Sequence, residues 1–480
     1  MSEAAKAGCT NEISANDTEA LGGRVVAEVS IGIEPEWAHA SRVSKFLNFF
    51  FELLDRFDVR YCVLHAWETL PDELPSDLDI SAHPDDRPRL TKVIRSLKTA
   101  GFQPVQCLHY GVEAYRFVFC WEEDSEFLSI PVDVTFEHVY GGVPAPRVEE
   151  LIEERQRFRN FWIAGPRSAF LYLLAKRIWK GGANAEQADQ LALLARNLGM
   201  NEAYELARRL LTRKAAREVI AACLNGSLNK TLRERRLNPW RKAILNHPLE
   251  LLRYFWSESV RLASRFTRPV GMLLAGLGPD GSGKSTLLER MASEFAEVFS
   301  RTQFYHWRPQ LLAPRANTSL IVNPHAQKPR KALPSTLFAI GFVVDYWVGF
   351  LFRIRPSMVR ASLVIFDRYF YDVMVDPKRS RFGGPVWVAK ALCKLVPSPD
   401  LLMLFDAEET TILSRKPELE MVELRRLRGA YRGLPYFVNR NSIVQTGCDI
   451  DVSALRACRV VAEFLSRRFE QRHTAWLAED

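Results

Sequence analysis

The sequence predicts an α/β fold for its C-terminal part, a parallel sheet flanked by helices, preceded by a small α+β domain and a helical subdomain. After Pro269, apolar strand-like runs alternate with helical segments, which implies parallel strands joined by right-handed crossovers. Residues 148–225 are rich in Leu, Ala and Arg at helical spacing. Residues 59–136 contain short runs rich in β-branched and aromatic residues. We therefore expect several compact units in one chain.

The α+β unit is predicted to begin with a helix over residues 41–57, where apolar residues recur at helical spacing. A second helix over residues 87–100 ends at Gly101, because glycine commonly stops a helix. Strands are expected over residues 59–66, 78–82, 115–120 and 129–136. In the C-terminal part, strands are expected over residues 270–277, 361–367 and 400–407, with a helix over residues 285–299.

These patterns divide the chain into five segments. They are a flexible polar tail (1–34), the α+β domain (35–147), the helical subdomain (148–228), a basic amphipathic linker (229–268) and the α/β domain (269–480). The total of 480 residues is compatible with two to four domains. A hydrophobic content of 47% excludes wholesale disorder, because it supplies enough apolar surface for real cores.

The net charge of +8 favours anionic partners such as nucleotides, although solvated surface charge explains it equally well. The sequence gives no firm nucleic-acid signal and is compatible with a homodimer. Its eight cysteines include no CxxC pair and no zinc-finger spacing with His. Residues 1–34 lack the apolar core of a signal peptide. We therefore expect a reducing, cytoplasmic location.

Two segments raise the question of a membrane. Residues 230–266 mix Arg with Trp, Tyr and Phe, which suits contact with a membrane surface or nucleic acid, or an amphipathic linker packed on its own domains. Residues 335–354 are long and apolar enough to cross a bilayer. Asp345 lies at their centre, where a charge costs about 2.5–3.5 kcal/mol on insertion scales. We expect this second segment to be a buried core helix.

The most specific motif follows the strand expected over residues 270–277. It matches G-x-x-x-x-G-K-[ST], with an apolar strand before it and a helix after it. Glycines let backbone N–H groups surround phosphates, and the N-terminus of the following helix adds partial positive charge. Lys284 is expected to reach the β- and γ-phosphates of ATP, and the Ser285 hydroxyl to ligate Mg²⁺. The predicted nucleotide-binding residues are Gly278, Asp280, Gly281, Ser282, Gly283, Lys284, Ser285 and Thr286.

From about Val270 onward, the chain resembles the thymidylate kinase family of P-loop kinases. The resemblance is carried by the Asp-Gly-Ser-Gly form of the phosphate loop, by residues 366–369 (FDRY), by residues 399–406 (PDLLMLFD) and by residues 415–418 with Tyr431. It implies a P-loop NTPase fold using ATP and Mg²⁺, with Asp280 contacting the acceptor and with Asp367 and Arg368 supporting Mg²⁺ and the transferring group. Lid residues implied to close over ATP are Arg415, Arg425, Arg426 and Arg428.

The acceptor side departs from that family. Residues 305–309 (YHWRP) replace its usual acceptor segment, although Arg308 is still a candidate for an acceptor phosphate. Charged residues 376–381 replace the stretch that helps to read thymine, which makes Asp376 and Arg379 further acceptor candidates unless this loop is merely exposed. This half resembles thymidylate kinase-like proteins encoded with bacterial surface-polysaccharide functions. The resemblance therefore implies a nucleotide or sugar-like acceptor, and dTMP is expected to be a poor substrate.

The α+β domain carries a second group of carboxylates. Asp77 and Asp79 share one face of a predicted strand, because alternate strand residues point the same way, and Asp133 lies on another strand. This resembles the nucleotidyltransferase superfamily, in which such a trio binds Mg²⁺. The upstream turn of that family normally contains glycine, whereas residues 64–68 here are LHAWE. We predict a divalent-metal site at these three residues, against the alternative of a solvated loop.

Three functions remain open from the sequence. The first is a phosphoryl-transferring enzyme acting on a small acceptor, with the nucleotidyltransferase-like domain as its partner. The second is a genuine dTMP kinase with an accessory domain. The third is an ATP-binding regulatory or scaffold protein without turnover. The Asp367–Arg368 pair and the basic lid favour catalysis, with Lys284, Asp367 and Arg368 as the catalytic residues.

Overall fold

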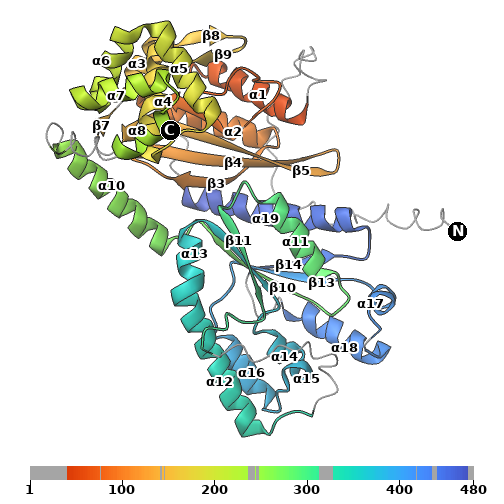
Figure 1. Ribbon diagram of the computed structural model, residues 1–480. Coiled ribbons are helices and arrows are strands. Elements are labelled where there is room, and N and C mark those ends of the chain that lie inside the picture. Colours follow the sequence, from red (N-terminus) through yellow and green to blue (C-terminus); the bar gives the residue numbers. More distant parts are fainter. Residues whose placement is uncertain are drawn as a thin grey trace, which may run out of the picture.

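The structure is a computed structural model that describes residues 41–75, 77–140, 143–144, 146–235, 244, 248–312, 328–417, 419–434 and 440–473. The predicted tail 1–34 and most of the basic stretch 230–242 lie outside these residues. Figure 1 shows two sheet-based units one above the other, with the α19 helix between them.

The upper unit is built on a seven-stranded mixed sheet in the order β3-β4-β5-β2-β1-β9-β8. Strands β2 and β5 pair in parallel, which places Asp79 directly beside Asp133. The strands are β1 (Tyr61–Val63), β2 (Leu78–Ala82), β3 (Gln103–His109), β4 (Glu113–Glu123), β5 (Glu126–Glu137), β8 (Gln156–Phe158) and β9 (Phe161–Ile163), and a separate small hairpin pairs β6 (Val139–Tyr140) with β7 (Val143–Pro144).

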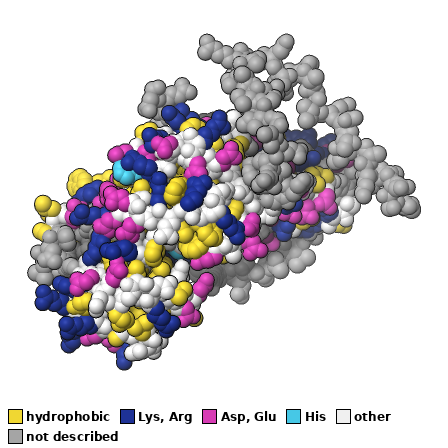
Figure 2. Space-filling view, turned by 90° about the horizontal axis from the view of Figure 1, so that it is seen from above, with side chains coloured by type: hydrophobic (Ala, Val, Ile, Leu, Met, Phe, Trp, Pro, Cys, Tyr) yellow, Lys and Arg dark blue, Asp and Glu magenta, His cyan; other side chains and the backbone are white. Residues whose placement is uncertain are grey.

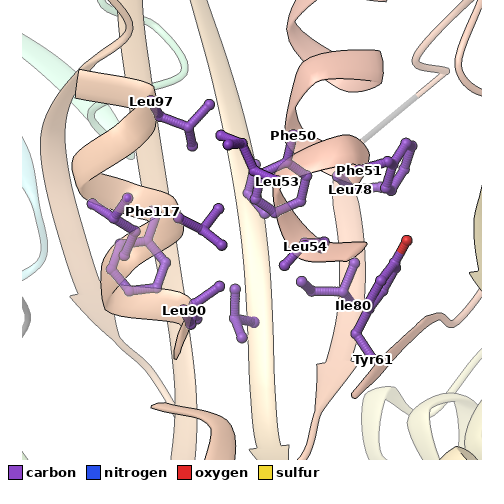
Figure 3. Packing of buried hydrophobic residues seen from close by; sticks show 14 of the residues in the cluster. Phe50, Phe51, Leu53, Leu54, Tyr61, Leu78, Ile80, Leu90, Leu97 and Phe117 are labelled. Atoms are coloured by element: carbon purple, nitrogen blue, oxygen red, sulfur yellow. The ribbon is translucent and has the colours of Figure 1, made fainter. Parts of the chain in front are cut away.

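Helices α1 (Arg42–Arg56) and α2 (Arg87–Thr99) pack on one face of this sheet. The short η1 turn (Pro84–Asp86) leads into α2. Figure 3 shows Phe50 and Leu54 of α1 and Leu90 and Leu97 of α2 meeting the side chains of the sheet. The two helices end within a residue or two of the predicted bounds, because their apolar spacing matches the face that they bury.

The helical subdomain differs from its predicted boundary. Hairpin β8–β9 lies inside residues 148–228 but extends the first sheet, pairing β9 with β1. The core of the helices also includes Cys62 and Leu64 from the end of β1, so helices and sheet form one packed body. The helices are α3 (Val148–Glu153), α4 (Pro166–Lys180), α5 (Ala185–Leu198), α6 (Met200–Leu210), α7 (Arg213–Leu224) and α8 (Leu228–Arg235).

The lower unit is a five-stranded parallel sheet in the order β11-β12-β10-β13-β14, which confirms the predicted α/β class. Its strands are β10 (Met272–Leu277), β11 (Arg301–His306), β12 (Ser362–Asp367), β13 (Leu401–Asp406) and β14 (Asn441–Gln445). Its helices are α11 (Lys284–Glu294), α12 (Ala332–Gly349), α13 (Arg355–Val359), α14 (Asp372–Val375), α15 (Pro377–Ser380), α16 (Val386–Cys393), α17 (Glu409–Arg415), α18 (Met421–Arg432) and α19 (Ile450–Arg472), with a π-helical stretch η3 (Phe350–Ile354) between α12 and α13.

Two helices join the units. Helix α10 (Pro248–Thr267) runs along one side of the molecule to the start of β10 (Figure 1), and its last turn accepts hydrogen bonds from Arg355 of α13. Helix α19 packs in one apolar cluster with Val105 and Val118 of the upper sheet. Arg468 of α19 donates to the carbonyl oxygens of Val270 and Gly271, just before β10. The phosphate-loop strand β10 shares this apolar cluster through Met272 and Leu274, and is thereby linked to the upper sheet.

The apolar segment around Asp345 is only partly the buried core helix that the sequence predicts. Residues Ala332–Val359 are long and apolar enough to cross a membrane, and 39% of the most apolar window is buried inside the structure. Asp345 itself is 2% exposed and accepts backbone N–H groups of Gln310, Leu311 and Leu312. One side of the helix packs on the sheet through Phe342 and Tyr346. Its other side leaves apolar side chains exposed, among them Leu333, Leu337, Val344, Trp347 and Leu351.

Surface charge is mixed on the face seen from above. Figure 2 shows Lys and Arg side chains interspersed with Asp and Glu, together with scattered apolar side chains. The net charge of +8 is therefore not gathered into one basic patch on that face. A surface of this kind gives no support for a broad nucleic-acid interface there.

Candidate active site

The phosphate loop has the backbone that its glycines permit. It connects β10 to α11, as predicted. Gly281 and Gly283 have φ angles of +87° and +80°, a region that side chains other than glycine rarely adopt. A Cβ on Gly281 would lie 2.9 Å from the carbonyl oxygen of Ile412. A glycine-rich loop with left-handed residues that leads into a helix N-terminus is a backbone suited to binding phosphate through its N–H groups.

Asp280 holds three cations together at the mouth of this loop. Its carboxylate lies 3.2 Å from the Lys284 ammonium and also pairs with the guanidinium groups of Arg368 and Arg379. Burial alone would raise the pKa of Asp280, but Arg368, Lys284 and Arg379 outweigh that effect and hold this pKa well below its usual range. The structure thus gives Asp280 a role in orienting cations, because both of its oxygens are already engaged.

Lys284 and Ser285 occupy the first turn of α11. The Lys284 side chain is 8% exposed, and burial, followed by the charge of Arg368, lowers its pKa. Ser285 Oγ donates to Asp367 Oδ2 at 2.6 Å. The second oxygen, Asp367 Oδ1, is buried and has no hydrogen-bond partner among the described residues. A hydroxyl beside a carboxylate oxygen that lacks a partner fits the oxygen ligands that Mg²⁺ prefers.

Arg368 is held in an unusual conformation. Its φ angle is +77°, its side chain is 2% exposed, and its backbone N–H donates to Gly276 O of β10. Arg368 Nη1 donates to Asp372 at 2.7 Å, and Asp372 also accepts the Tyr431 hydroxyl at 3.1 Å. Left-handed backbone in a non-glycine residue costs free energy, so the surrounding contacts must impose it. This network fixes the guanidinium beside the phosphate loop.

The predicted lid residues separate into two groups. Arg415, at the end of α17, donates to Thr446 O at 3.2 Å, and its guanidinium lies 3.6 Å from where a Cβ on Gly283 would be. Arg428 is instead buried and paired with Asp406 and Glu409. The other two candidates, Arg425 and Arg426, pair with acidic residues of α17 and α18. Among the four, Arg415 is thus the one that these contacts bring to the phosphate loop.

The predicted acceptor residues are also divided. Arg379 reaches Asp280, and Asp376 caps the helix that carries Arg379 by accepting its backbone N–H at 3.2 Å. Asp376 is 3% exposed, so this part of the loop is not merely solvated. Arg308 lies with its guanidinium carbon 4.9 Å from the centre of the Phe342 ring. Within the described residues Arg308 has no hydrogen bond or ion pair with the phosphate loop, and its acceptor role stays a prediction.

Thr446 is a supporting residue that the motifs did not reveal. Its hydroxyl donates to Ser282 O at 2.7 Å and lies 3.1 Å from Asp406 O. It therefore connects the phosphate loop to the ends of β13 and β14. Thr446 follows immediately after β14, a strand that the sequence analysis did not predict, and a single threonine in that position carries no recognisable signal.

The carboxylates of the α+β domain lie together but are already paired. Asp77, Asp79 and Asp133 line one cavity, so they face the same side of the sheet. Arg116 of β4 pairs with both Asp77 and Asp133. Lys176 of α4 lies 2.8 Å from Asp79 Oδ2. Within the described residues no group of three or more His, Cys, Asp or Glu has a metal-holding arrangement.

This pairing differs from the predicted metal site, and the reason is tertiary. Arg116 and Lys176 come from elements that the strand pattern of Asp77 and Asp79 does not include, so their approach was not visible in the motif. A divalent cation would have to displace both of them, and the three side chains as arranged do not fit Mg²⁺. Metal binding here stays a prediction that this arrangement does not favour.

Comparisons with known proteins concern part of the chain. No family model matches it. A thymidylate kinase of Xanthomonas euvesicatoria pv. vesicatoria is 27% identical over 157 residues, covering 31% of this chain. One of Xanthomonas oryzae pv. oryzae is 27% identical over the same length. This chain spans 62% and 61% of the length of these two relatives.

Among solved structures, a thymidylate kinase from Ehrlichia chaffeensis is 19% identical, with a TM-score of 0.29. The match covers 40% of this chain and 98% of that one. The similarity over part of the chain therefore rests on the Xanthomonas relatives named thymidylate kinases.

Proposed function

We propose that the lower unit catalyses ATP- and Mg²⁺-dependent phosphoryl transfer to a small nucleotide or sugar-like acceptor. The observation that carries the proposal is the convergence of Lys284, Arg368 and Arg379 on Asp280, beside the Ser285–Asp367 pair. Negative charge develops on the oxygens of a transferring phosphoryl group, and fixed cations in a water-poor site stabilise it. The partial similarity to thymidylate kinases supports the same reaction class.

Each side chain has a distinct part in the proposed reaction. The loop N–H groups and Lys284 bind the terminal phosphates of ATP, and Arg368 holds the transferring group in position. Ser285 and Asp367 would hold Mg²⁺, which when bound neutralises phosphate charge. Arg379 can exchange its contact with Asp280 for an anionic group of the acceptor. Arg415 covers the loop from the side of α17.

The acceptor distinguishes this proposal from a plain dTMP kinase. The charged residues Asp376 and Arg379 suit a charged or hydroxyl-rich acceptor better than a neutral thymine ring. We expect dTMP to give a kcat/KM below about 10⁴ M⁻¹s⁻¹, the lower end of the usual enzyme range. The role in surface-polysaccharide metabolism is part of this proposal and rests on the resemblance of the sequence.

The test is ADP release measured with ATP, Mg²⁺ and a panel of nucleoside monophosphates, sugars and sugar phosphates. An acceptor that raises ADP release above the rate without acceptor supports the proposal. Efficient turnover of dTMP would establish the dTMP kinase alternative. ATP binding without ADP release for any member of the panel would favour the scaffold alternative. Lys284→Ala serves as the inactive control in each arm.

A reducing, cytoplasmic setting is part of the proposal. The seven cysteines within the described residues are free thiols, and six of them are buried. Burial raises the pKa of Cys62 and of Cys458 to about 12, which keeps these thiols protonated and unreactive. Self-association into a homodimer stays a prediction, and sedimentation analysis of the full chain would test it.

A membrane contact through α10 is a second proposal, favoured by the outward side of that helix. None of its residues is buried, and Leu249, Leu252 and Trp256 are 79%, 66% and 73% exposed. Exposed apolar residues beside Arg suit an anionic membrane surface. Flotation with phosphatidylglycerol vesicles tests this proposal. Trp256→Glu should abolish vesicle binding. Trp387→Glu on α16 is the control: it removes a Trp that is about as exposed, and it should leave vesicle binding unchanged. Equal effects of the two substitutions would refute a role for α10.

A further inference from the structure

The cavity that Asp77, Asp79 and Asp133 line is in the upper unit, away from the phosphate loop. It has a volume of about 500 Å³ and lies between the sheet, helix α4 and helix α10. None of the phosphate-loop residues lines it. A cavity of this size is in the range of small-molecule sites, which run from roughly 300 to 1,000 Å³. Its chemistry is independent of the proposed phosphoryl transfer.

The floor of the cavity carries its own counter-charges. Arg116 Nε donates to Asp133 Oδ1 at 2.7 Å, and the same guanidinium pairs with Asp77. Lys176 Nζ donates to Asp79 Oδ2 at 2.8 Å and lies 3.0 Å from His65 Nε2. Among these side chains, Arg116 and Lys176 provide the positive charge that a metal ion would otherwise have to supply to neutralise the carboxylates.

The rest of the lining carries two acids and two bases, Glu137, Glu258, Lys180 and Arg261, together with aromatic side chains. Glu258 pairs with Arg261 on α10, so this wall adds no net charge. The cavity is also lined by the aromatic side chains Tyr110, Tyr140, Tyr172, Trp179 and Tyr254. Tyrosine and tryptophan offer an apolar ring face together with a polar group at the edge. The carboxylates can accept hydrogen bonds from the hydroxyl groups of a ligand, and the amino and guanidinium groups can donate hydrogen bonds to them.

This combination selects one class of ligand. A nucleoside triphosphate would bring several negative charges into a lining that already holds five carboxylates and four cations, so it fits poorly without a metal. A neutral ring compound with many hydroxyl groups fits well, because its hydroxyls both donate and accept and its C–H faces pack on aromatic rings. We propose that this cavity is a metal-independent binding site for a neutral mono- or disaccharide.

The experiment uses the full chain in EDTA. Binding of glucose, mannose, galactose, N-acetylglucosamine and maltose is measured by saturation-transfer NMR and titration calorimetry at millimolar concentrations. We expect at least one of these sugars to bind in EDTA, with an affinity that added Mg²⁺ does not change. Tyr110→Ala should weaken that binding about tenfold, the loss of roughly one ring contact. Circular dichroism checks that each variant is folded.

Two controls separate this site from the kinase site. Lys284→Ala, at the phosphate loop, and Trp387→Ala, an exposed Trp on α16, should both leave sugar binding unchanged. The proposal is overturned if none of the five sugars binds. It is also overturned if the Lys284→Ala protein binds UTP or ATP in a Mg²⁺-dependent manner that Asp79→Asn abolishes, because the cavity would then be a metal-dependent nucleotide site.

Discussion

At the scale of single residues, the candidate site depends on charges held in fixed places. Asp280 gathers Lys284, Arg368 and Arg379, and Asp372 fixes Arg368 from the opposite side. These ion pairs are largely buried, so water screens them weakly. Removing one partner leaves the others uncompensated, which makes each residue here a sensitive test of the proposed reaction.

Lys284→Ala is expected to reduce phosphoryl transfer at least about 100-fold, because a fixed cation at the transferring group is lost. The side chain also neutralises Asp280, but Arg368 and Arg379 remain to pair with that carboxylate. The fold should therefore persist, as checked by circular dichroism and thermal unfolding. Near-wild-type ADP release by a folded variant would contradict the assignment of Lys284.

His138 provides a pH test in the upper unit. It is 4% exposed and its Nε2 lies 3.0 Å from Ser81 Oγ. Burial lowers the pKa of His138 from 6.5 to about 3. Below pH 6.5 the unfolded chain therefore binds a proton at His138 that the folded chain does not bind. The unfolding free energy should therefore fall as pH drops from about 6.5 to 3, by about 1.4 kcal/mol per pH unit, with no contribution above 6.5.

The measurement is the urea midpoint of the wild type and of His138→Gln at pH 7.5, 6 and 5. Glutamine keeps a group that can bond to Ser81 but does not titrate. We expect the difference between the two proteins to change steadily below pH 6.5 and to be constant above it. Parallel pH profiles would show that His138 is not the group responsible.

At the scale of elements, the phosphate loop is defined by its neighbours as much as by its own sequence. Gly278 lies against the carbonyl oxygen of Phe405 in β13, and Gly281 against that of Ile412 in α17. Thr446, after β14, donates to the loop itself. The loop is therefore clamped between β13, α17 and β14, which keeps its N–H groups in place before ATP arrives.

Gly281→Ala is expected to weaken ATP binding about tenfold. Its φ of +87° disfavours alanine, and the new methyl group would lie 2.9 Å from Ile412 O, so the loop must shift. Gly429→Ala, inside α18, is the matched control, because nothing lies within 4 Å of its new Cβ and alanine favours a helix. Fluorescent-nucleotide titration measures both, and equal affinities would show that the loop tolerates the shift.

At the scale of the whole molecule, α19 joins the two units into one body. Its inward side packs with Val105 and Val118 of the upper sheet and with the strands of the lower one. Its Arg459 pairs with Glu122 of β4, and Lys98 of α2 pairs with Glu470. The upper unit therefore supports the last helix of the lower unit, although the two are far apart in sequence.

Val105→Asp should lower the thermal stability of both units together. Val105 is 1% exposed, so the new carboxylate would be buried without a partner, at a cost of several kcal/mol. Phosphoryl transfer should be lost at a lower temperature than in the wild type, even though Val105 is not in the lower unit. Ser125→Asp, in the exposed β4–β5 turn, is the control. Unfolding of the upper unit alone, with kinase activity intact, would contradict this coupling.

The sequence by itself determined the local features. The spacing of apolar residues in α1 and α2, the alternation of strands and helices after Pro269, and the glycines of the phosphate loop each depend on neighbouring residues. Strands β3, β8, β9, β11 and β14 were not predicted, and all of them except β9 lie at the edge of a sheet. Short or partly exposed strands have weak alternation of apolar and polar residues, which explains why the pattern missed them. The sequence therefore predicted helices and strands correctly wherever the apolar residues had a strong periodicity or a specific motif was present.

Tertiary structure alone decided which charges meet. The contacts of Arg379 with Asp280, of Arg428 with Asp406, and of Arg116 and Lys176 with the carboxylates of the upper cavity each join different elements, 17 to 99 residues apart in the chain. A motif states which residue types are present, but a long Arg or Lys side chain pairs with whatever acid the fold brings within reach. That is why the phosphate loop was found from its sequence, whereas the pairing of Asp77, Asp79 and Asp133 with cations was not.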